Sequence, residues 1–100
     1  MNSKQCMIKQ AIVSELSGTY GRPNPELPKL DIFDKESCEN MTNYIPRFKA
    51  GKEDQAHIQK IIDEWCDNTS VDMCGIVRFR NGFAEILVES RKMVRMFMNM

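Results

Sequence analysis

The chain has 100 residues, of which 42% are hydrophobic and 28% are charged, and its formal net charge is zero. This length fits a single domain over residues 1–100, and the apolar content is enough for a core, which excludes a wholly disordered chain. The balanced charge disfavours a free-standing nucleic-acid binder. The apolar runs are too short to span a bilayer or to form a signal-peptide core, so we expect a cytoplasmic protein without a membrane partner.

The N-terminal part predicts a helix followed by an extended connector. In residues 4–17, apolar side chains such as Ile8 and Ile12 recur at helical spacing, and Gly18 suits the position just after a helix. Residues 19–30 hold three of the chain's four prolines. Because proline lacks a backbone donor and restricts its neighbour, this stretch is expected to be an extended connector inside the domain.

Two more helices are expected in the middle of the chain. A short one is predicted over residues 35–44, with Pro46 ending the run. The clearest helix spans residues 52–67, where an apolar stripe faces a charged, mainly acidic side. The stripe, predicted to be core, consists of Ile58, Ile61, Ile62, Trp65 and Cys66.

A β-hairpin is predicted over residues 74–89. Asn81-Gly82 is the strongest short hairpin signal, since both residues tolerate positive φ, and a two-residue turn fixes the register. A slip by one residue would bury both hairpin arginines. The predicted cross-strand pairs are Arg80 with Phe83, Phe79 with Ala84, Arg78 with Glu85, Val77 with Ile86, Ile76 with Leu87 and Gly75 with Val88.

This register gives the hairpin two different faces. One face is apolar and fit to be covered by a helix; it holds Val77, Phe79, Ala84, Ile86 and Val88. The other face pairs Arg78 with Glu85 and sets Arg80 beside the Phe83 ring.

The predicted fold is α+β, with helices packed on one face of a small antiparallel sheet. Two strands alone are marginally stable. A third strand is therefore expected from residues 30–33 or from the C-terminal tail, unless a homodimer completes the sheet. The tail after Ser90 fits a strand or a helix, and we favour the helix.

No catalytic residue, metal ligand or cofactor site is assigned. The four cysteines include no closely spaced pair of the kind that binds zinc, so we expect four free and mostly buried thiols. His57 lies near carboxylates in the sequence, but no nucleophile motif accompanies it, and a surface position is the better interpretation.

The candidate binding site is the half-polar hairpin face with the basic tail, because arginine beside aromatic and aliphatic groups is typical of interface centres. Residues 75–100 hold five basic and two acidic side chains, whereas residues 53–72 hold six acidic ones and a single lysine. The candidate partner-binding residues are Ile76, Arg78, Arg80, Phe83, Leu87, Arg91, Lys92 and Arg95.

Three functions are compatible with the sequence. The first is a non-enzymatic protein-binding module, an adaptor or inhibitor of a larger partner, as many small accessory proteins of phages and mobile elements are. The alternative is a nucleic-acid-binding domain that contacts phosphates through the basic hairpin and tail. The third is an enzyme that uses a thiol together with His57, which we do not favour.

Overall fold

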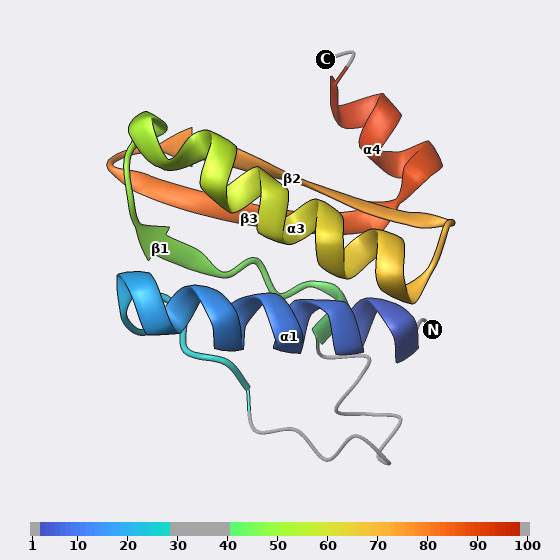
Figure 1. Ribbon diagram of the computed structural model, residues 1–100, viewed down its shortest axis with the longest axis horizontal. Coiled ribbons are helices and arrows are strands. Elements are labelled where there is room, and N and C mark those ends of the chain that lie inside the picture. The colour runs from blue at the N-terminus through green and yellow to red at the C-terminus, as the bar shows by residue number, and fades with distance from the viewer. Residues whose placement is uncertain (1–2, 29–40, 99–100) are drawn as a thin grey trace.

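The computed structural model describes residues 3–28 and 41–98 of the chain (Figure 1). Its elements are α1 (Ser3–Tyr20), β1 (Arg47–Lys49), the 3-10 turn η1 (Lys52–Asp54), α3 (Gln55–Thr69), β2 (Met73–Arg80), β3 (Phe83–Ser90) and α4 (Arg91–Met98). The three strands form one antiparallel sheet in the order β1-β3-β2. The α+β prediction is confirmed.

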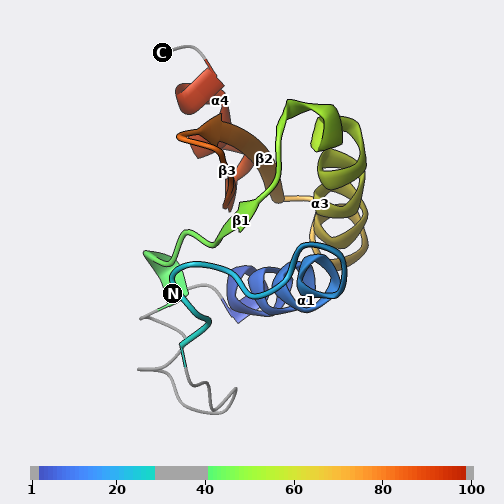
Figure 2. The same cartoon turned by 90° about the vertical axis from the view of Figure 1, so that its left-hand side faces the viewer.

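The core lies between the sheet and the pair α1 and α3, which cover one face, whereas α4 lies on the other side of the two long strands (Figure 2). The predicted apolar hairpin face points into this core: Ala84, Ile86 and Val88 are almost completely buried. Phe48 of β1 fills the centre with no exposed surface. Burial of the larger side chains, Ile86, Val88 and Phe48, contributes about 1.5–3 kcal/mol each.

The hairpin register is confirmed at every predicted pair, from Arg80 opposite Phe83 to Gly75 opposite Val88. Asn81 and Gly82 form the turn with φ of 55° and 82°. These left-handed angles are the ones that an Asn-Gly turn is chosen for.

The predicted end of the first helix is wrong. Gly18 does not end α1, which continues to Tyr20, and Gly21 with φ of 83° takes the left-handed position after it. The amide of Gly21 donates to Ser17 O at 3.0 Å. Two glycines stand near this boundary, and only the backbone distinguishes which of them turns the chain.

The prediction that Trp65 is core is also wrong. Its side chain is 37% exposed, and its Nε1 donates to Glu15 Oε2 at 2.6 Å. The other stripe residues of α3 are buried against the sheet. Trp65 lies at the border of that stripe, where α3 meets α1, so its indole N–H finds a carboxylate in place of the core.

The third strand comes from a place that the sequence reading did not foresee. Residues 47–49 form β1 and pair with β3, opposite Phe83–Glu85. The tail is helical as α4, which confirms the favoured interpretation and corrects the strand alternative. The other proposed source, residues 30–33, lies outside the described residues.

Lys9 is a buried cation that ties α1 to the segment before β1. Its Nζ donates to the carbonyls of Met41, Thr42 and Tyr44 at 2.8, 3.0 and 2.9 Å. Residues 41–42 are helical, so these are carbonyls at a helix end, a usual place for a lysine cap. Burial lowers the pKa of Lys9 to about 8, and at neutral pH the ammonium form can serve all three acceptors. The rest of the helix expected over residues 35–44 lies outside the described part.

Glutamine side chains close parts of the sheet edges. Gln59 of α3 donates to Gly75 O at 2.8 Å and accepts from Val77 N at 3.2 Å, as a neighbouring strand would. Gln5 of α1 donates to Val88 O at 2.7 Å beyond the end of β1. Gln59 therefore satisfies backbone groups on the free edge of β2, and Gln5 satisfies a carbonyl of β3 that β1 is too short to reach.

Glycine substitutions test the packing of α3 on the sheet. A methyl group at Gly75 would lie 2.6 Å from Ile62 Cγ2 and 2.8 Å from Leu87 O, whereas Gly18 has open space around it. We expect Gly75→Ala to lower the free energy of unfolding by about 1–3 kcal/mol. Gly18→Ala, within α1, should raise it by about 0.5–1 kcal/mol. Urea unfolding followed by circular dichroism measures both. Destabilisation by Gly18→Ala would contradict the helix end assigned to α1.

Lys9→Met tests the buried cap. The variant keeps the length of the side chain but leaves buried carbonyls without their donor, so we expect the free energy of unfolding to fall by about 2 kcal/mol. Lys4→Met, at an exposed position of the same helix, is the matched control and should change it by less than about 0.5 kcal/mol. Equal stability of the two variants in urea titrations would show that the cap adds nothing.

Candidate basic binding face

A basic face forms on the side of the sheet that points away from α1 and α3. Arg47, Glu85 and Arg78 lie in register across the three strands, and Lys49, Phe83 and Arg80 form the next row. Residues directly opposite each other, and residues two apart along a strand, share a side of a sheet. We call this set the basic sheet face; it consists of Arg47, Lys49, Arg78, Arg80, Phe83 and Glu85.

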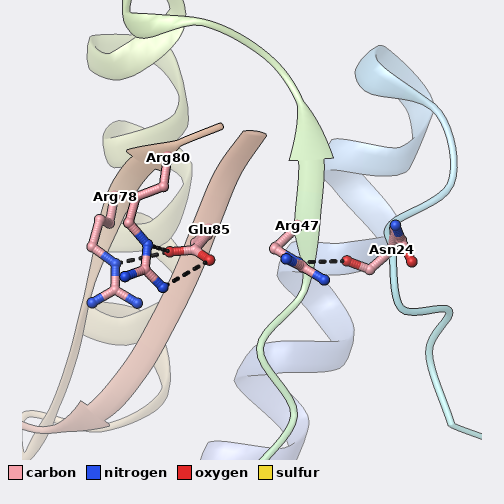
Figure 3. Close-up of polar contacts among 5 residues, drawn as sticks. All are labelled: Asn24, Arg47, Arg78, Arg80 and Glu85. Atoms are coloured by element: carbon pink, nitrogen blue, oxygen red, sulfur yellow. Dashed lines mark hydrogen bonds and ion pairs between the residues drawn. The ribbon is translucent and has the colours of Figure 1, made fainter. Parts of the chain in front are cut away.

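Glu85 organises the centre of the basic sheet face (Figure 3). Its Oε1 accepts from Arg78 Nε at 2.8 Å and from Arg80 Nε at 2.9 Å, and its Oε2 lies 3.4 Å from Arg80 Nη2. The carboxylate side chain is only 7% exposed, but those of Arg78 and Arg80 are 40% and 58% exposed. One buried anion therefore holds two cations whose outer edges face solvent.

The charge state of Glu85 follows from these contacts. Burial alone pushes the pKa of its carboxyl group upward, but the hydrogen bonds and positive charges of Arg78 and Arg80 outweigh burial and hold the pKa below its ordinary value. The carboxylate is consequently ionised at neutral pH. Two guanidinium groups with one carboxylate leave a net positive charge at the centre of the face.

Arg47 lies on β1, across β3 from the two hairpin arginines, and is held by contacts of its own. Its guanidinium carbon lies 5.9 Å from the centroid of the Phe83 ring, a cation–π distance, and its Nε donates to Asn24 O at 3.2 Å. Figure 3 shows Asn24 beside Arg47, on the segment that follows α1. The backbone joins the same segments, since Asn24 N donates to Arg47 O at 2.8 Å. The Pro-rich connector thus supports the edge of the basic sheet face.

The structure separates the predicted site residues into two groups. Arg78, Arg80 and Phe83 lie near the hairpin turn, whereas α4 begins at the opposite end of the hairpin (Figure 1). In α4, Arg91 is bound to Val71 O and to Asp67 Oδ1, the latter at 3.3 Å.

The remaining predicted residues do not extend the basic sheet face. Lys92 and Arg95 are exposed on α4, away from the turn. Ile76 is half-buried and Leu87 is 8% exposed, so Leu87 packs beneath the surface and offers little of itself to a partner.

Arg47 and Lys49 were missed by the sequence reading. A signal was present: Phe48 is apolar between two basic residues, and Pro46 and Gly51 flank the run. Such alternation predicts a short half-buried strand with both basic side chains on its outer side. A run of three residues does not predict a strand reliably. Only the pairing of β1 with β3 shows that Arg47 and Lys49 belong to the basic sheet face.

The thiols that the structure describes are poorly suited to nucleophilic chemistry. Cys66 is 1% exposed, and burial raises its pKa to about 12; burial also raises the pKa of Cys74. His57 is exposed on α3, and its ring meets that of Tyr20 in an edge-type arrangement with 6.4 Å between the centroids. Cys6 is buried, and Cys38 lies outside the described residues.

Comparison of the chain with models of known protein families, with curated proteins and with solved structures finds no match. Within residues 3–28 and 41–98, no group of histidine, cysteine and acidic side chains is arranged to hold a metal ion. No helix of that part is long and apolar enough to cross a membrane. The function must therefore be inferred from the geometry of the basic sheet face.

Alkylation tests the thiol hypothesis directly. Because iodoacetamide reacts with the thiolate, we expect Cys66 to be modified about a hundredfold or more slowly in the native protein than in urea at about pH 8. Peptide mass spectrometry resolves each cysteine, Cys38 included. Fast modification of any one of them in the native protein would revive an enzyme that uses a thiol with His57.

Proposed function

We propose that this chain is a small non-enzymatic binding module, an adaptor or inhibitor, whose basic sheet face docks onto an acidic surface of a larger protein. The observation that carries the proposal is the buried Glu85, which holds the guanidinium groups of Arg78 and Arg80 together with their outer edges exposed. Arginine beside an aromatic side chain is the composition of interface centres.

Charge distribution supports an acidic partner. The chain is neutral as a whole, yet the basic sheet face has four basic side chains and one acidic one. Exposed acids such as Asp63, Glu64 and Asp67 lie on α3, which covers the opposite face of the sheet. Such an uneven field orients a charged partner during approach and repels the wrong side.

The alternative function is nucleic-acid binding, which the clustering of basic side chains around Phe83 favours. Proteins that bind single strands use exposed aromatic rings as stacking platforms. Here Arg47 lies over the Phe83 ring at 5.9 Å, so one face of the ring is already occupied. This contact favours the protein-binding proposal over the alternative.

Charge reversal on and off the basic sheet face tests the proposal. Lys49→Glu and Lys60→Glu alter exposed lysines and change the net charge equally, but Lys60 lies on α3. With tagged protein and nuclease-treated host lysate, we expect a defined set of proteins to be captured by wild type and by Lys60→Glu. Capture by Lys49→Glu should fall about tenfold, because it sets like charges against the partner.

Quantitative mass spectrometry reads out the result. Equal capture by all three proteins would show that the basic sheet face is not the docking surface. Capture that disappears with nuclease in every case would replace the proposal with nucleic-acid binding, which should also weaken steeply with salt.

A further inference from the structure

We infer that the Arg78–Arg80 pair is an oxyanion-recognition centre that takes a carboxylate group from an acidic peptide segment of the partner. The inference rests on the proposed function and names the chemistry of its contact. The partner's carboxylate would be bound by directed hydrogen bonds from two oriented guanidinium groups, and not only by attraction to a diffuse positive surface.

Arg78 and Arg80 have N–H donors that Glu85 does not use. Arg78 donates to Glu85 through Nε alone, and Arg80 through Nε and Nη2. A guanidinium group carries more N–H donors than these contacts use, in a planar fork that matches both oxygens of a carboxylate. Among the residues that the structure describes, no other acceptor contacts either group. The free edges point to solvent, since both side chains are at least 40% exposed.

The two guanidinium groups are also preorganised for binding. A free arginine loses much rotamer freedom when it binds, which weakens its net contribution. Glu85 has already restricted both side chains at their Nε atoms, 2.8 and 2.9 Å from its Oε1. The remaining N–H groups therefore meet an incoming anion in a fixed arrangement, at a smaller entropic cost than two unrestrained side chains would pay.

Two further basic residues flank the Arg78–Arg80 pair. Lys49 lies in the same row as Arg80, across Phe83, and Arg47 lies in the same row as Arg78, across Glu85. A segment with several acids can thus meet the fork with one carboxylate and the flanking cations with others. A chain of phosphates is less well matched, because the basic residues of α4 lie at the far end of the hairpin.

An octaglutamate peptide serves as the probe, with isotope-labelled protein and NMR detection of the arginine Nε–H signals. We expect the peptide to shift the signals of Arg78 and Arg80. In the variant R78K/R80K, which keeps the charge but loses the forks, affinity should fall about tenfold. The control R91K/R95K makes the same exchange at exposed arginines of α4, at the opposite end of the hairpin from the turn, and its affinity should equal that of wild type.

Each outcome is decisive once backbone NMR spectra show that both variants are folded. Equal affinity of wild type and R78K/R80K would overturn the inference, because charge alone would then explain binding. Unshifted Arg78 and Arg80 signals would overturn it as well. Tighter binding of a thymidine octanucleotide at the same residues would assign the centre to phosphate and to nucleic acid.

The inference and the proposed function can fail separately. If capture from lysate depends on Lys49 while R78K/R80K binds octaglutamate normally, the docking surface stands and the fork does not. If the fork binds octaglutamate but lysate yields no protein that depends on Lys49, the oxyanion centre stands and the docking proposal does not.

Discussion

A carboxylate in the middle of a sheet must be paired with cations or give up its charge, and this constraint shapes the outer side of the protein. Glu85 lies on β3, the only strand with a neighbour on each side within the described sheet. Its position directly opposite Arg78 brings in that guanidinium, and Arg80 joins from two residues along the same strand. The exposed donors of the basic sheet face are a consequence of satisfying one buried anion.

The edges of this small sheet also carry polar backbone groups that need partners. β1 reaches only three residues of β3, and α1 supplies Gln5 to a carbonyl of β3 beyond them. On the other edge of the sheet, α3 supplies Gln59 to backbone groups of β2 that have no strand beside them in the described sheet. In the same way, the ammonium group of Lys9 donates to backbone carbonyls in the segment before β1. Polar side chains on the inner sides of α1 and α3 thus help to fix where these helices lie on the sheet.

Sequence reasoning reached the parts of the fold that local chemistry determines. The Asn81-Gly82 turn fixes a register without outside information, and so the Arg78–Glu85 pair was predictable. Local patterns could not reveal that Arg47 lies opposite Glu85, because a three-residue strand is selected by its partner and not by its own periodicity. The prediction for Trp65 was wrong because helical spacing includes it in the apolar stripe of α3. Only the position of α1, whose Glu15 accepts from the indole N–H, shows that its side chain lies at the surface.

The most direct test of this account is the pKa of Glu85, measured by following its carboxyl carbon in an NMR titration of the wild-type protein. The account predicts a pKa below that of a glutamate in an unfolded chain, because the two guanidinium groups outweigh the burial of the carboxylate. A pKa at or above the unfolded value would contradict it. In that case the arginines would not be held by the carboxylate, and the basic sheet face would lose the feature that organises it.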